Sequence, residues 1–462
     1  MRPAKTAKAL LALWLSLTVP GLAETENRQA ALHLGLDQAR EVAVAALTSG
    51  QPRLAFSLTE GLLKADPQDG HALYVQARAL AQLRDFDKGR RSAAKAYRFA
   101  TTDTQHFESA TLAAQLSIAG QRMTHSQLWL RRASHYAPDD RTRGEAIAAF
   151  RQARNRNPLN VQLSFSVSPS DNVNNGSNSP LNIIDGVPVS GILSQSAQAI
   201  SGWTSTLNVQ ASYRVRETET SETRIVARGL AYHVEFNDPV PGLSASDLAS
   251  QRLGLGVAHI WNPDDTGFWR FNGDGGRVWY GGDPSYDFLS ANVGRVQKLS
   301  DRWQLSFGVA VEEQFDDSRP IRDATVWSGN VGLTHLFDTG STITVSALYR
   351  ETATDFSLRA STQWSGIVRY NHGRQIGPAM LSVSLGHSSV DYYAYSLALL
   401  GTTVFRGRED NSWFGEVSAT LKSASYMGFV PVVSLRTEQS RSNISRFDVD
   451  QTGVSVGIRS EF

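Results

Sequence analysis

The side chains that most often carry out chemistry in proteins form no catalytic or metal-binding pattern in this sequence. The chain has no cysteine, which excludes a thiol nucleophile, a thiolate metal site and a disulfide framework. The HExxH, GxSxG and P-loop motifs are also missing, and the ten histidines are scattered. We therefore expect no enzymatic activity, no cofactor and no metal site.

Three weaker features have simple structural explanations. His125 and His135 lie in the half of the chain that reads as helical, where packing or solvation explains them better than ligation does. The glycine-rich stretch NGDGGRVWYGGD does not open a helix, so it indicates close backbone approaches in a strand rather than a phosphate site. The acidic pair Glu312 and Glu313 is expected to begin a loop and to face water.

The N-terminus predicts a signal peptide over residues 1–23. A basic start, a short apolar core and small residues just before Glu24 are the three parts of such a segment, and we expect cleavage between Ala23 and Glu24. A membrane anchor is disfavoured because the apolar run is too short to span a bilayer. The mature protein would then be periplasmic, secreted or a β-barrel in an outer membrane.

Residues 24–157 favour good helix formers and carry an internal repeat. The tetratricopeptide template of ~34 residues places repeat starts near Leu36, Gly70 and Phe107. The positions where paired helices approach closely are mostly small: Ala43, Ala55, Leu62, Ala77, Gly89, Ala96, Ala114, Ser126 and Ala133. We predict an α-solenoid of helical hairpins that offers a concave face to peptides or protein partners. A generic amphipathic bundle is the alternative.

From residue 158 to residue 462 the apolar residues recur with a period of two, which is typical of β-strands. Long strands, a small and hydroxyl-rich polar face, and aromatic residues near strand ends favour a membrane barrel over a soluble sandwich. The pattern predicts fourteen antiparallel transmembrane strands, beginning near Leu159, Ser201, Glu222, Ser250, Phe268, Tyr286, Arg302, Ala324, Thr342, Ser361, Gly377, Ser412, Met427 and Val449. The sheet must close, because only closure pairs every backbone group in hydrocarbon.

The connections between these strands alternate between tight turns and mostly longer loops, as in outer-membrane barrels. With an even strand count, both ends of the barrel and the helical domain would lie on the periplasmic side. The net charge of +1 gives no electrostatic reason to expect a nucleic-acid partner. Outer-membrane lipid would surround the barrel, which we expect to be monomeric.

An asparagine-rich stretch, SPSDNVNNGSNSP at residues 168–180, follows the first predicted strand. It includes Asp171, Asn172, Asn174 and Asn175, whose side chains favour turns that they cap themselves. The stretch is either a surface loop or a segment that folds inward and narrows the lumen as a plug. The apolar segment at 390–411 would line the barrel mouth or contact a client.

The order of these parts resembles the surface lipoprotein assembly modifier family, the outer-membrane translocators of type XI secretion. A signal peptide, tetratricopeptide-like helices, and a first strand that ends in SPSDNVNNGSN before a fourteen-strand domain carry the resemblance. It implies a translocator that delivers specific lipoproteins or soluble secreted proteins to the cell surface. It also implies that the helices bind the client or a periplasmic chaperone. An exopolysaccharide export protein or a diffusion porin is the alternative.

The C-terminal stretch SVGIRSEF fits the strand signal that barrel-assembly machinery is thought to recognise. Ser455, Gly457 and Phe462 occupy its polar, glycine and aromatic positions, whereas Ser460 departs from its hydrophobic position. We expect this last strand to pair with the first one, near Leu159. Deleting Phe462 is expected to impair insertion into the membrane.

Overall fold

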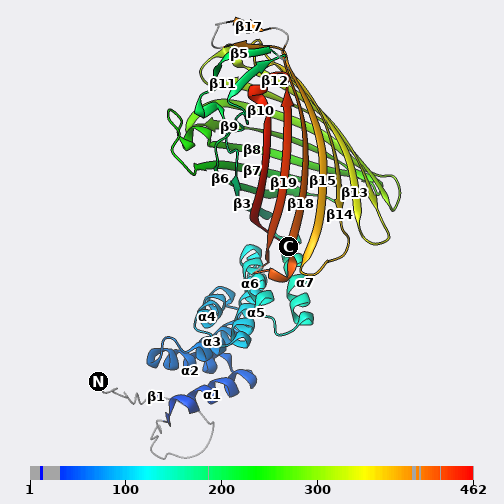
Figure 1. Cartoon of the computed structure of the whole chain (residues 1–462). Coiled ribbons are helices and arrows are strands. Elements are labelled where there is room, and N and C mark those ends of the chain that lie inside the picture. The colour runs from blue at the N-terminus through cyan, green and yellow to red at the C-terminus, as the bar shows by residue number, and fades with distance from the viewer. Residues whose placement is uncertain are drawn as a thin grey trace, which may run out of the picture. The chain divides into compact units, whose positions relative to one another are not determined.

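The computed structural model describes residues 11–13, 32–185, 187–397, 402–404, 407–426 and 428–460. The chain divides into two compact units, with the division between Asn157 and Pro158. We call them the helical unit and the barrel unit (Figure 1). The predicted signal peptide lies mostly outside the described residues, and so do Ala23 and Glu24 on the two sides of the predicted cleavage site. The short strand β1 (Leu11–Leu13) is described and pairs with β2 (Leu32–Leu34).

The described part of the helical unit is built from seven helices in sequence. They are α1 (Leu36–Thr48), α2 (Pro52–Ala65), α3 (Gly70–Gln82), α4 (Phe86–Arg98), α5 (Asp103–Ala119), α6 (Met123–His135) and α7 (Asp140–Arg156). Each helix packs on the next one, and α3 also packs on both α1 and α5. Contacts between the first helices of successive hairpins are what stack such repeats into a solenoid, so this prediction is confirmed.

Small residues allow these helices to approach one another. Ala55, Ala77, Ala114 and Ser126 are fully buried, and the other predicted close-approach positions are buried as well. The third repeat begins at Asp103 rather than near Phe107. The reason is local, because the Thr102 hydroxyl accepts a hydrogen bond from the backbone N–H of Gln105 at 3.2 Å and caps the helix four residues earlier.

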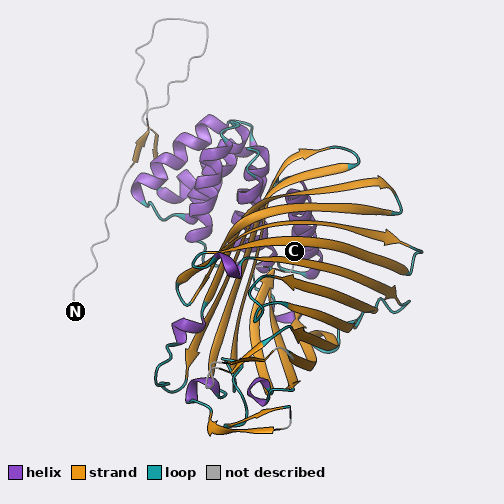
Figure 2. Ribbon diagram, turned by 90° about the horizontal axis from the view of Figure 1, so that it is seen from above, coloured by secondary structure: helices purple, strands orange, loops and turns teal. Residues whose placement is uncertain are grey.

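The barrel unit is one closed antiparallel sheet of fourteen strands. In chain order they are β3 (Leu159–Ser170), β6 (Gly202–Glu217), β7 (Ser221–Phe236), β8 (Ser250–Asp264), β9 (Gly267–Tyr280), β10 (Asp283–Lys298), β11 (Trp303–Asp316), β12 (Ala324–Leu336), β13 (Thr342–Ala353), β14 (Ser361–Asn371), β15 (Ala379–Tyr392), β18 (Arg408–Leu421), β19 (Phe429–Ser442) and β20 (Val449–Ser460). The predicted count and antiparallel order are confirmed. Figure 2 shows these strands, in orange, as one curved wall.

The strands pair with their neighbours in chain order, and β20 closes the sheet against β3. Among the described residues, this closing pair is the shortest ladder of the barrel. It has five paired positions, from Gly453 opposite Ser170 to Arg459 opposite Ser164, whereas β19 pairs with β20 along all the described residues of β20. In Figure 1 the last strand, in red, lies close to the green strands that begin the barrel.

The outer face of the barrel is apolar. On β8, for example, Leu253, Leu255 and Val257 point outward and are each at least half exposed. Aromatic residues form two outward girdles: Tyr213, Trp261 and Trp303 near one rim, and Trp203, Phe315, Trp327 and Trp364 near the other. A soluble protein would not leave such a band open to water, and a bilayer covers it with its hydrocarbon layer and its interfaces. The barrel unit is therefore of the outer-membrane type.

The connections between barrel strands define two different rims. We call the edge that carries residues 218–220, 265–266, 299–302, 337–341, 372–378 and 422–428 the turn rim. The opposite edge, the long-loop rim, carries 171–201, 237–249, 281–282, 317–323, 354–360, 393–407 and 443–448. Pro158 and Ser460 both lie at the turn rim. The predicted alternation holds, and 281–282 is the short exception.

Two short hairpins stand on the long-loop rim. Strands β4 (Leu181–Ile184) and β5 (Val187–Ile192) form one, and β16 (Tyr395–Leu397) and β17 (Thr402–Val404) form the other. The second hairpin occupies the apolar segment that the sequence places at the barrel mouth, although part of that segment lies outside the described residues. Within the described ranges, no helix has both the length and the hydropathy needed to cross a membrane.

Candidate functional site

The inner wall of the barrel is the largest candidate site, and it is rich in arginine. Strand alternation turns every second residue inward, opposite the exposed apolar residues of the outer face. The inward positions hold Arg214, Arg224, Arg228, Arg252, Arg270, Arg350, Arg369, Arg408, Arg436 and Arg459.

Two of these arginines pair with carboxylates on strands that are not their direct neighbours in the sheet. Arg228 lies 3.2 Å from the Asp274 carboxylate, and Arg252 lies 2.6 Å from that of Glu312. The guanidinium of Arg252 also stands 3.5 Å from the centre of the Phe288 ring. The expectation that Glu312 begins a loop and faces water is wrong, because β11 continues to Asp316 and turns this side chain into the lumen. Its partner Arg252 is sixty residues away in the sequence, so local pattern could not reveal it.

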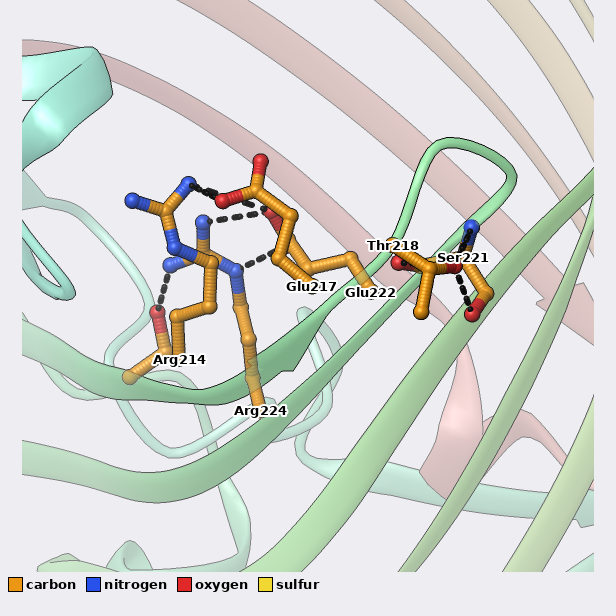
Figure 3. A network of polar contacts seen from close by, with 7 residues as sticks. Arg214, Glu217, Thr218, Ser221, Glu222 and Arg224 are labelled. Atoms are coloured by element: carbon orange, nitrogen blue, oxygen red, sulfur yellow. Dashed lines mark hydrogen bonds and ion pairs between the residues drawn. The ribbon is translucent and has the colours of Figure 1, made fainter.

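A second network lies at the turn rim, where β6 joins β7 (Figure 3). Arg214 lies 3.0 Å from the Glu217 carboxylate and 3.7 Å from that of Glu222, which also binds Arg224. Arg224 further donates a hydrogen bond to the Ser212 hydroxyl at 3.4 Å. The four charged groups neutralise one another, so this corner of the rim carries little net field.

Two more arginines of the wall are paired and stacked on aromatic rings. Arg408, near the long-loop rim, binds Asp410 at 3.0 Å, and its guanidinium stands 3.7 Å from the ring of Tyr392. Arg436, midway along β19, binds Glu438 at 2.8 Å, lies 3.7 Å from the Glu416 carboxylate and stands 4.1 Å from the ring of Phe414.

Four inward arginines have no carboxylate within ion-pair distance among the described residues: Arg270, Arg350, Arg369 and Arg459. All four side chains are exposed. Arg369 donates to the Ser384 hydroxyl at 3.0 Å, and Arg459 donates to the Thr420 hydroxyl at 3.0 Å. The lumen therefore carries an excess of positive charge.

The asparagine-rich segment is ordered by its own side chains. The Asn172 amide donates to the Gly176 carbonyl at 2.8 Å and accepts from the Gly176 N–H at 2.8 Å. The Asn174 amide donates to the carbonyls of Ser196 and Gln198 and accepts from the Ile200 N–H at 3.0 Å. These bonds join the two ends of the long connection 171–201.

The other two residues of this prediction are placed differently. Asn175 has a left-handed backbone with φ of 50°, a conformation that asparagine tolerates better than most residues. Asp171 accepts a weak hydrogen bond from the backbone N–H of Thr452 on β20 at 3.4 Å. It therefore touches the strand that closes the barrel.

The same segment lies against the inner wall at the long-loop rim. Val173 and Ile200 are buried together with Val234, an inward residue of β7. Farther on, the Ile183 N–H donates to the Ser445 hydroxyl at 2.7 Å, which ties the β4–β5 hairpin to the connection 443–448. Because the segment is anchored on both sides of the β3–β20 seam, it is fixed across the place where the barrel closes. Its action as a plug stays a prediction.

The residues of the predicted assembly signal lie on β20, except for Phe462, which is outside the described residues. Ser455 faces the lumen opposite Ser434 of β19. Gly457 lies opposite Ser166 of β3, and a Cβ added to it would stand 2.7 Å from the Phe165 carbonyl oxygen. The glycine thus has a structural role at the seam, since no other residue would let β3 approach so closely.

The helical unit holds a separate cluster of aromatic and basic side chains on α4, α5 and α6, in which Trp129 belongs to the buried core and the side chains around it are half-buried. The Tyr97 ring meets His106, Trp129 and Tyr136 edge-on, with centroids 4.9 to 6.0 Å apart. Arg132 stands 4.4 Å from the Trp129 ring. Such rings and cations are the side chains that protein interfaces favour. Across the described ranges, no group of three or more histidine or acidic side chains is arranged to hold a metal ion.

Comparison with known proteins gives structural likenesses only. No protein-family model matches the sequence, and no curated protein matches it. The TPR2B domain of yeast Sti1, in its complex with pHsp70, is 18% identical, with 26% of this chain and 97% of that chain covered and a TM-score of 0.24. OccAB3 of Acinetobacter baumannii is 10% identical over 65% of this chain and 99% of its own, with a TM-score of 0.32. A bacterial polysaccharide outer membrane secretin is 9% identical over 65% and 98%, with a TM-score of 0.32.

Proposed function

We propose that this protein is an outer-membrane translocator that delivers specific lipoproteins or soluble secreted proteins to the cell surface. The observation that carries the proposal is the presence, in one chain, of a stacked helical-hairpin unit and a closed membrane-type barrel. Stacked hairpins do no chemistry and typically bind peptides or proteins. A barrel that served only for diffusion would have no need of them.

In this proposal the turn rim faces the periplasm, because short turns lie on that side of outer-membrane barrels. The helical unit would then be periplasmic and would engage the client or its chaperone. The half-buried side chains of Tyr97, His106 and Arg132, which pack around the buried Trp129, are the part of the unit that we assign to that contact. No nucleotide is available in the periplasm, so client binding and client folding outside the cell would supply the free energy of transport.

Deletion of the gene tests the proposal. Intact cells of the deletion strain would be treated with an external protease or a biotin reagent, and the labelled surface and secreted proteins would be compared with those of the parent. We expect one or a few proteins to disappear from the surface while remaining in whole-cell extracts. The full-length chain supplied in trans should restore them. Unchanged surface and secreted proteomes would overturn the proposal.

Export of an exopolysaccharide is the second candidate, and the lining of the lumen favours it. Phe288 and Phe414 face inward under arginine side chains, and stacked aromatic and charged groups suit a sugar polymer. The same deletion strain separates the two functions. Loss of cell-surface polysaccharide with an unchanged surface proteome would support export of a glycan instead of a protein.

A further inference from the structure

Three of the arginines without a carboxylate partner stand at one end of the lumen. Arg270 is three residues from the turn-rim end of β9, Arg369 is two from that end of β14, and Arg459 is one from that end of β20. The fourth, Arg350, lies toward the opposite rim on β13. The turn rim therefore holds a set of inward cations that the wall itself does not neutralise.

The three arginines are spread evenly around the barrel. Following the closed strand order, β9 and β14 are five strands apart, β14 and β20 four, and β20 and β9 five. Both strand alternation and the contacts of the three side chains show that they face inward. Arg369 and Arg459 bond to the inward hydroxyls of Ser384 and Thr420, and Arg270 stands 5.5 Å from the ring of Phe268, also an inward residue.

Other charges near this rim do not cancel the set. The carboxylates of Glu217 and Glu222 are held by Arg214 and by its neighbour across the turn (Figure 3). Around the turns, Asp301 and Asp338 are paired with Lys298 and Arg302. The remaining carboxylates, of Glu219, Asp264 and Asp265, are balanced in number by Arg216, Arg374 and Lys422. The net charge at the mouth thus comes from the three inward guanidinium groups.

We propose that Arg270, Arg369 and Arg459 form an anion-selective ring at the turn-rim mouth of the lumen, and that the ring binds carboxylate groups entering there. Rings of cationic side chains select anions in other pores, and a guanidinium pairs with a carboxylate through two parallel hydrogen bonds. The lumen walls confine the field, and it is screened over about 8 Å at physiological salt. The inference holds whether the larger cargo is a protein or a glycan.

The test uses the purified full-length protein in planar lipid bilayers. Under a KCl gradient, the sign of the reversal potential gives the preference for chloride or potassium. We expect wild type to prefer chloride. The variant R270Q/R369Q/R459Q should lower the chloride-to-potassium permeability ratio by about tenfold, the low end of what a charged cleft does to local ion concentration. Citrate, as a carboxylate probe, should block wild type at lower concentration than it blocks this variant.

A matched control variant removes one positive and one negative charge from the same lumen, so the net charge of the lumen does not change. The double variant R228Q/D274N deletes an ion pair of 3.2 Å and should keep the wild-type reversal potential. Heat-modifiable mobility on a gel checks that each barrel has folded. If the triple variant does not fold, the three single variants decide the question, since each should move the reversal potential part of the way.

Several results would overturn the inference. They are a wild-type barrel that prefers potassium or shows no preference, a wild-type barrel that carries no current, and folded arginine variants with an unchanged reversal potential. A charge-conserving R270K/R369K/R459K variant should keep the preference for chloride and bind citrate more weakly, because lysine lacks the planar fork of arginine. Equal block by citrate in this variant and in wild type would refute the carboxylate part.

Discussion

Single residues at the β3–β20 seam decide whether the barrel can close. A membrane barrel tolerates no open edge, since an unpaired backbone group in hydrocarbon costs several kcal/mol. The closing ladder is short, so each position in it matters more than a position in the middle of the sheet. Gly457 is the most constrained of them, because β3 approaches its Cα directly.

Replacing Gly457 with alanine should therefore weaken closure. The new Cβ would stand 2.7 Å from the Phe165 carbonyl oxygen, and relieving that overlap costs about 1–3 kcal/mol. We expect less heat-modifiable barrel in the membrane fraction at the same expression level. Gly366→Ala on β14 is the matched control, since no atom lies within 4 Å of its added Cβ. Equal assembly of the two variants would contradict this reading of the seam.

Asn174 is the corresponding residue of the asparagine-rich segment. Its side-chain amide joins the two ends of the connection 171–201, so Asn174→Ala should loosen the segment that lies on the inner wall. We expect larger or noisier single-channel currents than in wild type. Gln195→Ala changes an exposed side chain of the same connection and should leave the current as it is. Wild-type currents in the Asn174 variant would count against a plugging role.

At the scale of elements, the helices of the helical unit depend on capping at their N-termini. The Asp139 carboxylate caps α7 by accepting the backbone N–H of Thr142 at 2.7 Å. This hydrogen bond, with a smaller contribution from the Thr142 side chain, lowers the pKa of Asp139 below its usual range. Asp85 caps α4 in the same way, and there the Lys88 side chain is the main reason for a lowered pKa.

A carboxyl whose pKa is lower in the folded state stabilises the fold above its ordinary pKa and loses that contribution as the pH falls through the folded value. The helical unit should therefore melt at a steady temperature from neutral pH down to about pH 4 and at lower temperatures below it. The melting temperature of the helical unit can be measured in detergent from the circular dichroism signal of its helices. Asp139→Asn keeps a capping oxygen but cannot titrate, so its melting temperature should fall less between pH 4 and pH 3. An equally steep fall would show that other groups govern the acid response.

At the scale of the whole molecule, two units with separate cores should unfold separately. Backbone hydrogen bonds around a closed sheet stabilise the barrel unit, whereas the helical unit depends on a core made largely of small side chains. On heating in detergent, we expect the helical signal to vanish at a temperature at which the barrel still runs in its compact form on a gel. A single transition shared by both signals would contradict two independent units.

The sequence predicts this architecture well and its interior poorly, for physical reasons. The predicted strand starts lie within four residues of the observed ones. The largest difference is at β18, which the pattern starts at Ser412 rather than Arg408, because the first residues of that strand are charged and carry no apolar alternation. The inward ion pairs cannot be predicted from the sequence. Arg252 on β8 and Glu312 on β11 come together only because of the register of three successive strand pairs, β8 with β9, β9 with β10 and β10 with β11.

The even number of antiparallel strands has a consequence for how such a protein can change over time. Because Pro158 and Ser460 stand at one rim, gain or loss of a complete hairpin leaves both of them on the side where they began. A single-strand change would instead move one of them to the opposite rim. Gain of two strands can therefore widen the pore, and loss of two can narrow it, while both ends of the barrel stay at the same rim.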